Sequence, residues 1–155
     1  MDALVIYYHR SPRTRAAALA VANAVGAHAY AHDDTESAPP SSRRQSTPSR
    51  VERNVELARV EVVVVGTPAH DGALPTSIEA FLREKARAAR SLAFFCTAGG
   101  AGGARALARM TELVRRDPIA ALSLGGADIH GLDVEIPVGR FVRELEAAFL
   151  AAEVA

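Results

Sequence analysis

The sequence predicts an α/β protein: a doubly wound five-stranded parallel sheet with helices on both faces. Short apolar runs rich in β-branched and aromatic residues recur along the chain, as is typical of strands buried on both faces of a parallel sheet. Helical patterns separate these runs, and such alternation favours an open parallel sheet. The length of 155 residues suits one domain, spanning 1–155. With right-handed crossovers the expected strand order is 2-1-3-4-5.

Five segments are candidate strands. The clearest are nearly continuous in apolarity: 3–8 (ALVIYY), 60–66 (VEVVVVG) and 91–97 (SLAFFCT). Two weaker candidates are 27–31 (AHAYA) and 120–126 (AALSLGG). Together they supply the five strands of the predicted sheet.

Two helices have recognisable ends. The first is expected from Thr14 to Val25 and should stop at Gly26, a residue suited to the left-handed C-cap. Another should begin near Thr76, because Thr76 and Glu79 have the spacing of a capping box.

Two further helices are indicated by apolar side chains at helical spacing. The stripes are Leu107, Met110 and Val114 in one, and Phe141, Leu145 and Phe149 in the other. The former helix should end before Pro118. Residues 32–50 have three prolines, much Ser and Arg, and no period, which predicts a mobile loop.

Composition narrows the expected partners and compartment. Eighteen basic and eighteen acidic residues cancel, so we expect neither nucleic acid nor a membrane as a partner. The single cysteine, Cys96, excludes an intrachain disulfide and suits a reducing cytoplasm. The start of the chain lacks the pattern of a signal peptide, and no apolar run approaches a membrane span. We therefore expect a cytoplasmic protein, and a homodimer is compatible with the sequence.

Ligands of doubly wound sheets bind beyond the carboxyl ends of the strands, where the strand order reverses. Here that point lies between the first and third strands. The loops that should meet there are 9–15 (HRSPRTR), 67–75 (TPAHDGALP) and 97–105 (TAGGAGGAR). All three are rich in Gly, Pro or hydroxyl residues and lead into helices, so we expect a ligand among them.

The first of these loops has the features of an anion site. Ser11 is a good N-cap, and Pro12 fits the first helical position. The backbone N–H groups of Arg13 and Thr14 would then point out of the helix start, beside the hydroxyls of Ser11 and Thr14. Positive charge would come from Arg10, Arg13 and Arg15. The alternative is that Ser-Pro merely starts a helix and the arginines are solvated.

The whole chain resembles the flavodoxin-like proteins, which are FMN-binding electron carriers and flavin or quinone reductases. The segment VEVVVVGTPAHDGALPTSIEAFL (60–82) is similar to the third strand, flavin loop and following helix of that family. SLAFFCTAGGAGGARALARM (91–110) is similar to its fourth strand and second flavin loop. The resemblance implies FMN as cofactor, and electron transfer or reduction of a small acceptor as function, with a small molecule or a protein as redox partner.

The resemblance also implies which residues hold the cofactor. The first loop would hold the phosphate, and the other two loops would flank the isoalloxazine ring. No side chain is predicted to act as a catalytic acid or base. The residues placed at the cofactor are His9, Arg10, Ser11, Arg13, Thr14, Thr67, Pro68, Ala69, His70, Asp71, Gly72, Thr97, Ala98, Gly99 and Gly100.

The first loop departs from the family pattern S-x-T-G-N-T. Aligned on Thr14, this chain has HRSPRT at 9–14, so that Pro12 replaces a glycine whose N–H would donate to the phosphate. His70 stands where the family often stacks an aromatic side chain on the flavin. Both departures favour an alternative: a flavodoxin-like module that has lost FMN and binds a phosphorylated ligand or a partner.

Another alternative is a metal-dependent enzyme. His9, His70 and His130 all follow predicted strands, and Asp71 and Asp128 accompany two of them. Such a set of imidazoles and carboxylates could hold zinc or iron. The spacing along the chain matches no short metal-binding motif.

Overall fold

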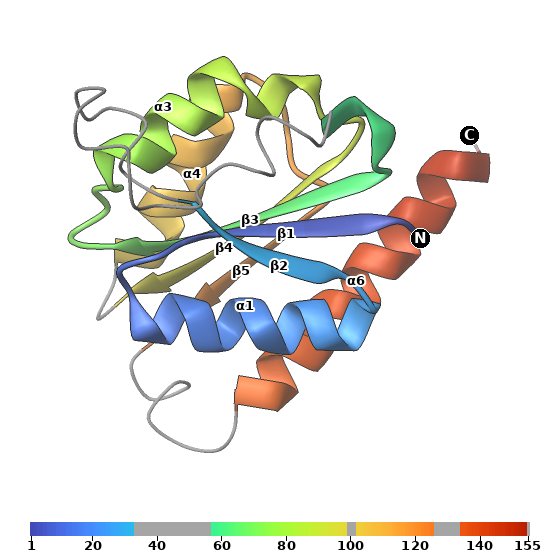
Figure 1. Cartoon of the computed structure of the whole chain (residues 1–155), viewed down its shortest axis with the longest axis horizontal. Helices are drawn as coiled ribbons and strands as arrows, with labels where there is room; N and C mark the ends of the chain where they lie inside the picture. The colour runs from blue at the N-terminus through green and yellow to red at the C-terminus, as the bar shows by residue number, and fades with distance from the viewer. Residues whose placement is uncertain (33–56, 99–101, 126–133, 155) are drawn as a thin grey trace, which may run out of the picture.

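The computed structural model describes residues 1–32, 57–98, 102–125 and 134–154, and it confirms the doubly wound fold (Figure 1). All strand pairs are parallel, and the order in the five-stranded sheet is β2-β1-β3-β4-β5, as predicted. The strands are β1 (Ala3–Tyr8), β2 (His28–His32), β3 (Val62–Ala69), β4 (Leu92–Ala98) and β5 (Ala120–Leu124). The helices are α1 (Pro12–Val25), α3 (Thr76–Glu84), α4 (Gly103–Val114) and α6 (Glu135–Val154), with short 3-10 turns at Leu57–Arg59 and Ala86–Ala88.

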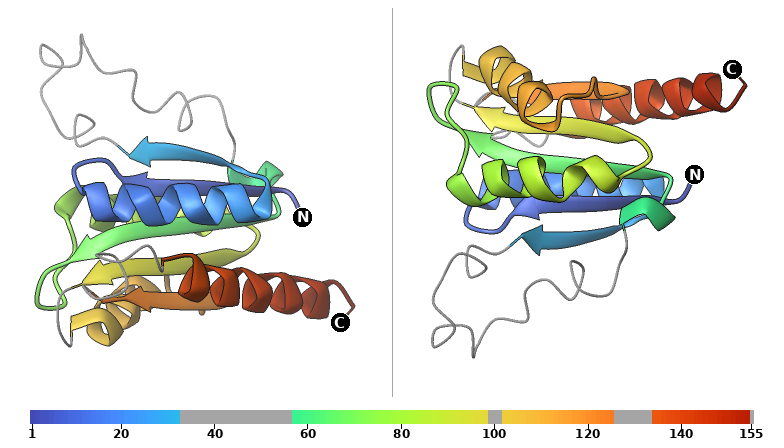
Figure 2. Two further views of the ribbon diagram at one scale, coloured as in Figure 1. Left: turned by 90° about the horizontal axis from the view of Figure 1, so that it is seen from below. Right: turned by 90° about the horizontal axis from the view of Figure 1, so that it is seen from above.

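The helices form one layer on each face of the sheet. Helices α1 and α6 cover one face, and α3 and α4 cover the other (Figure 2). Right-handed crossovers between parallel strands produce this arrangement. The carboxyl ends of β1, β3 and β4 therefore lie at one edge of the sheet, with Tyr7 beside Gly66 and Ala69 beside Ala98.

Each face of the sheet has its own hydrophobic core. Successive side chains of a strand point to opposite faces of the sheet, so adjacent residues of β4 pack in different cores. Phe94 packs in the core under α3 and α4, and Phe95 packs in the core under α1 and α6. Gly66 makes room for Phe95, since a Cβ atom at position 66 would lie 1.9 Å from the ring. That close approach explains a glycine in a strand of valines.

Most of the predicted elements are confirmed. Helix α1 ends at Gly26, which has the expected positive φ of 70°. Helix α4 ends at Val114, before Pro118 as expected, with Arg115 in the left-handed conformation. In α6, Phe141 and Leu145 are buried and Phe149 packs against the same core. In α4, Met110 and Val114 are buried in the core on the other face of the sheet, and Leu107 packs against that same core.

The predicted capping box of Thr76 and Glu79 is wrong. Helix α3 has Pro75 as its N-cap, and no side chain caps it. Thr76 is already the first helical residue, so its hydroxyl lies beyond the position from which a cap can act. The Glu79 carboxylate accepts a hydrogen bond from Arg109 of α4 at 3.2 Å instead. A contact between helices has replaced the local one.

Several predicted boundaries moved. Helix α1 begins at Pro12, two residues before the predicted start at Thr14, and β3 begins at Val62, two residues after the predicted start at Val60. Strands β2 and β4 each begin and end one residue later than predicted. The third strand runs to Ala69, three residues beyond the predicted end at Gly66, because Thr67, Pro68 and Ala69 continue to pair with β4. The fifth ends at Leu124. Of the predicted loop 32–50 only His32 is described, and it is the last residue of β2; the rest lies outside the described residues.

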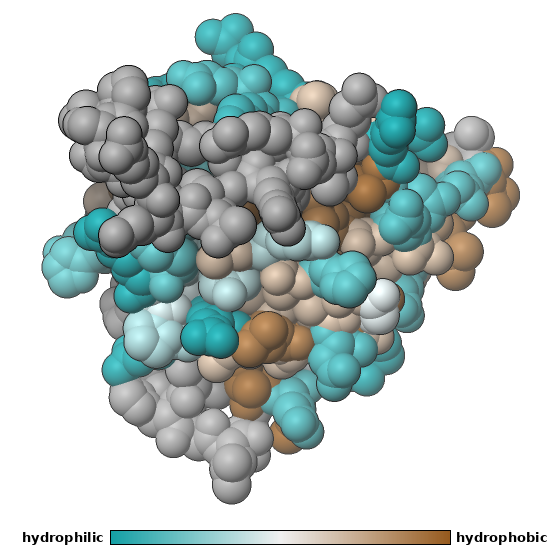
Figure 3. All heavy atoms as spheres, viewed as in Figure 1, coloured by the Kyte–Doolittle hydropathy of each residue, from teal (hydrophilic) through white to brown (hydrophobic). Residues whose placement is uncertain are grey.

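The described surface holds a few exposed apolar side chains. In the space-filling view, apolar and hydrophilic residues lie next to one another on the visible face (Figure 3). No helix in the described part of the chain is long and apolar enough to cross a bilayer. The exposed large apolar residues are Met1, Leu19, Ile136, Leu150 and Val154.

Candidate ligand-binding site

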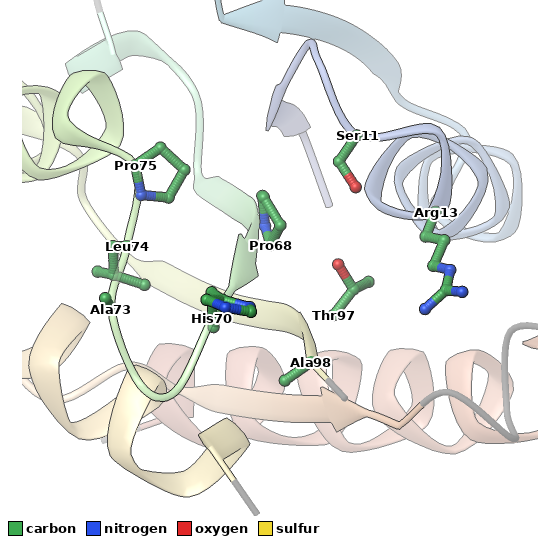
Figure 4. A pocket seen from close by; sticks show the side chains of 10 residues that line it. Ser11, Arg13, Pro68, His70, Ala73, Leu74, Pro75, Thr97 and Ala98 are labelled. Carbon is green, nitrogen blue, oxygen red and sulfur yellow. The ribbon is translucent and has the colours of Figure 1, made fainter. Parts of the chain in front are cut away.

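A cavity of about 530 Å³ lies at the carboxyl edge of the sheet, where β1, β3 and β4 end (Figure 4). This volume is in the range of small-molecule and cofactor sites. The cavity lies at the reversal of strand order, as predicted. Its lining residues are Ser11, Arg13, Pro68, Ala69, His70, Ala73, Leu74, Pro75, Thr97 and Ala98.

The loop after β1 starts helix α1 as the sequence predicts. Ser11 is the N-cap, with extended backbone at φ −106° and ψ 111°, and Pro12 lies in the first turn. The Ser11 Oγ accepts the backbone N–H of Thr14 at 3.2 Å. The positive end of the helix dipole therefore faces the cavity wall formed by Ser11 and Arg13.

Thr14 lies behind this wall, because its side chain is fully buried and does not line the cavity. Its Oγ1 is 2.9 Å from Ser11 Oγ and 2.8 Å from Thr97 Oγ1. Both its N–H and its hydroxyl are thus used inside the protein. The direct contact with a phosphate that the sequence predicts for Thr14 is not available in this conformation.

The loop after β3 is a tight hairpin. His70 and Ala73 exchange backbone hydrogen bonds of 3.0 and 2.8 Å. The two residues of the turn have positive φ, 50° at Asp71 and 84° at Gly72. Asp-Gly with two positive φ angles is typical of the type I′ turn. The hairpin places His70 and Ala73 at the cavity, whereas Asp71 and Gly72 do not line it.

The hairpin rests on the start of α4. A Cβ atom on Gly102 would lie 2.9 Å from the backbone nitrogen of Gly72. A Cβ atom on Gly72 would lie 3.1 Å from Cβ of Arg105. Only glycine allows these backbones to approach so closely. The loops after β3 and β4 thus support each other beside the cavity.

Sequence reasoning missed part of the cavity wall. Ala73, Leu74 and Pro75 line the cavity but were not among the predicted site residues. They follow the turn and return along the ligand side of the loop. The Asp-Gly pair was the signal that could have found them, because it predicts a chain reversal. Of the predicted glycines after β4, Gly99 and Gly100 lie outside the described residues.

Besides Thr14, Asp71 and Gly72, three further predicted residues do not line the cavity: His9, Arg10 and Thr67. The His9 Nδ1 is 2.9 Å from the carbonyl oxygen of His32 and must donate, since a carbonyl only accepts. Its Nε2 then accepts from Arg10 Nε at 3.3 Å. These contacts tie the loop to the end of β2. Thr67 is fully buried, and its hydroxyl donates to the carbonyl of Pro68.

Cys96 is a buried free thiol near the carboxyl end of β4. Burial raises the pKa of its thiol. A hydrogen bond with Ser123 lowers this pKa, but the effect of burial is larger. The thiol lies 3.5 Å from the carbonyl oxygen of Gly103, to which it donates. A neutral buried thiol behaves as a small apolar residue.

Among the described residues, no group of three His, Cys, Asp or Glu side chains lies close enough to hold a metal ion. Both ring nitrogens of His9 have hydrogen-bond partners, His32 at the end of β2 and Arg10 in the loop. His130 and Asp128, which the metal hypothesis also uses, lie outside the described residues. The described part of the chain therefore lends the metal hypothesis no support.

Comparison with known proteins gives similarity in structure alone. The sequence matches no protein-family model and no curated protein sequence. An archaeal flavodoxin has a TM-score of 0.65 and 18% identity, covering 96% of this chain and 99% of that one. Flavodoxin 2 of Bacillus cereus has the same TM-score and identity, covering 98% and 99%. A flavoprotein from Lactobacillus acidophilus NCFM, solved in complex with FMN, has a TM-score of 0.59 and 12% identity, covering 83% and 95%.

The sheet order and the cavity at its reversal define a doubly wound α/β protein with a ligand site at the switch point. Within that class, the matches over nearly the whole chain show that the protein has the flavodoxin-like fold.

Proposed function

We propose that the protein binds FMN in the cavity at the carboxyl edge of the sheet and uses it for electron transfer or for reduction of a small acceptor. The observation that carries this proposal is the cavity itself, which joins a helix start to a tight hairpin. One similar structure is a flavoprotein in complex with FMN, and it supports the same ligand. When bound, FMN supplies the redox chemistry.

The helix-start end of the cavity suits the phosphate of FMN. Ser11 Oγ accepts two hydrogen bonds from Thr14, so its own proton is left for a ligand. Arg13 lines the same end and adds positive charge. The dipole of α1 favours an anion there as well. Pro12 contributes no N–H, so this chain holds the anion with side chains and charge more than with backbone.

The opposite end suits a flat ring. Pro68, Leu74 and Pro75 give this part of the cavity apolar walls. In Figure 4 the His70 ring lies between Leu74 and Thr97. A rigid hairpin holds these residues in place. The residues of this chain therefore bind and orient the flavin and exclude water from one side of it.

A second function is favoured by Pro12 and by the burial of Thr14. Both reduce the number of donors facing a phosphate. A module that keeps the fold, lacks FMN and binds another phosphorylated ligand would use the same Ser11 and Arg13. The two functions differ in whether a flavin ring is bound beside the hairpin.

A titration with FMN and riboflavin tests the proposal. We expect FMN to bind with one-to-one stoichiometry and riboflavin, which lacks the phosphate, to bind more weakly, as followed by flavin fluorescence. Arg13→Gln should weaken FMN binding by about tenfold, because a charged hydrogen bond contributes roughly 1.5–3 kcal/mol. It should leave the affinity for riboflavin unchanged.

Arg15→Gln is the matched control. Arg15 is an exposed arginine of the same helix, and it does not line the cavity. It should change FMN binding by less than about twofold, as exposed and distant charges contribute little. Absence of flavin binding at tens of micromolar would reject FMN. Retained binding of a simple phosphate ester would then support the second function.

A further inference from the structure

Three hydroxyl groups form a line from the sheet to the start of α1. Thr97 at the end of β4 contacts Thr14 at 2.8 Å, and Thr14 contacts Ser11 at 2.9 Å. Thr97 and Thr14 are 83 positions apart in the sequence. Thr14 is fully buried, whereas Ser11 and Thr97 both line the cavity. The two ends of the line thus face the ligand, and only its middle is hidden.

Counting protons gives the line a direction. A hydroxyl has one proton to donate and two lone pairs to accept. The Thr14 hydroxyl donates to Ser11, so the proton between Thr14 and Thr97 must come from Thr97. Ser11 already accepts from the Thr14 N–H and from the Thr14 hydroxyl. Its own proton has no acceptor among the described residues and is available at the cavity.

The two ends therefore offer different chemistry. Ser11 presents a donor, and Thr97 presents lone pairs, since its proton points to Thr14. If the hydrogen bonds ran the other way, from Ser11 to Thr14 to Thr97, the Ser11 oxygen would face an anion with a lone pair, which is repulsive. An anion near Ser11 and Arg13 thus selects the direction that makes Thr97 an acceptor. Figure 4 shows the Ser11 and Thr97 hydroxyls pointing toward one another across this part of the site.

We propose that Thr97, Thr14 and Ser11 form a directed hydrogen-bond relay, and that Thr97 is a positioning residue for a polyol phosphate. The phosphate lies at Ser11 and Arg13, and a hydroxyl of the polyol donates to Thr97. Each hydrogen bond in such a chain polarises the next, so a donor at Thr97 strengthens the donor at Ser11. This proposal rests on the proposed function, because the ribityl phosphate of FMN is the polyol phosphate in question.

The test compares Thr97→Val with Thr97→Ser in the full chain. Valine keeps the shape and removes the hydroxyl, whereas serine keeps the hydroxyl and removes a methyl group. Thr97→Val should weaken FMN binding by about three- to tenfold, the order of one net hydrogen bond. Thr97→Ser should stay within about twofold of the unsubstituted protein. A role in packing alone would give the opposite order, because serine is the smaller residue.

A double-mutant cycle with Ser11→Ala tests whether the two ends communicate. The structure records no hydrogen bond between Ser11 and Thr97, both of which are described, so the path between them within the protein runs through Thr14. Thr97→Val should have a smaller effect on FMN affinity in the Ser11→Ala background than alone. Equal effects in both backgrounds, or equal losses in the valine and serine variants, would overturn the relay.

Inorganic phosphate separates failure of the relay from failure of the proposed function. Phosphate should raise the unfolding temperature of the unsubstituted protein, since a ligand that binds only the folded state stabilises it. Thr97→Val should reduce this rise and Thr97→Ser should preserve it. If FMN fails to bind while this pattern is seen, FMN is rejected as the ligand, and the relay is retained for another ligand that carries a phosphate. If FMN binds and the variants do not differ, the relay is rejected and FMN stands.

Discussion

Pro12 is the residue at which helix stability and ligand binding oppose each other. Its fixed φ suits the first turn of α1, where the missing N–H leaves no intrahelical bond unmade. The same missing N–H leaves the anion end of the cavity one backbone donor short. The Thr14 N–H does not replace it, since it donates to Ser11. Pro12 therefore favours the start of the helix, and it leaves fewer N–H donors for an anion bound there.

Pro12→Ala separates the two effects. It should restore an N–H at the helix start and tighten FMN binding by up to about tenfold, because one charge-assisted hydrogen bond is gained. It should also lower the free energy of unfolding by about 0.4–1 kcal/mol, because the unfolded chain becomes more flexible. Fluorescence titration and urea unfolding measure the two changes. Riboflavin is the control ligand, and equal tightening of both flavins would mean that this loop does not hold the phosphate.

The hairpin after β3 is the element on which the geometry of the site depends most. Its turn requires positive φ at Asp71 and Gly72, and it packs directly on Gly102 and Arg105 of the next loop and helix. Because the two loops touch, the apolar wall of the cavity depends on a contact between segments that follow different strands. Disturbing the turn should therefore affect both stability and ligand binding.

Gly72→Ala tests this dependence. Alanine at a φ of 84° is strained by roughly 1–2 kcal/mol, and its Cβ would meet Arg105 at 3.1 Å. The variant should be less stable in urea and should bind FMN more weakly. Gly26→Ala is the matched control, because Gly26 has a φ of 70° and no atom within 4 Å of the added Cβ. It should lose similar stability and keep its FMN affinity; loss of affinity in both variants would show that the hairpin has no special role.

The helices and strands were predicted well because the residues that indicate each one lie within the element itself or next to it. The valines of β3 and the Phe-Phe pair of β4 indicate buried strands, and Ser11, Pro12 and Gly26 mark the ends of α1. The capping box failed because helix α3 already includes Thr76, and Glu79 pairs instead with Arg109, which lies 30 positions away. No local pattern contains such a contact.

The same distinction applies to the site. The three loops follow from the strand order, and the resemblance to the flavodoxin-like proteins names most of the lining residues within them. The burial of Thr14 could not be predicted, because it depends on Thr97 from a distant strand. The return of Leu74 and Pro75 to the cavity depends on the turn geometry at Asp71 and Gly72. Long-range packing therefore decides which residues of a predicted loop actually face the ligand.

At the scale of the whole molecule, one sheet is shared by two hydrophobic cores. Phe94 and Phe95, adjacent in β4, belong to opposite cores and are each 0% exposed. The strand that carries them lies between β3 and β5 and ends at the ligand cavity. Neither helical layer can therefore lose its packing without disturbing a strand that the other layer also uses. This arrangement links both cores to the site.

Phe94→Ala and Phe95→Ala test whether the two cores form one cooperative unit. Each should lower the free energy of unfolding by about 3–5 kcal/mol, as expected for a fully buried phenylalanine. Unfolding should remain a single transition, with circular dichroism and tyrosine fluorescence coinciding along a urea titration. Leu19→Ala on α1 is the control: Leu19 is 48% exposed, so its removal should change stability by less than about 0.5 kcal/mol. Separate transitions in either phenylalanine variant would show that the layers unfold independently, and the shared strand would then not couple them.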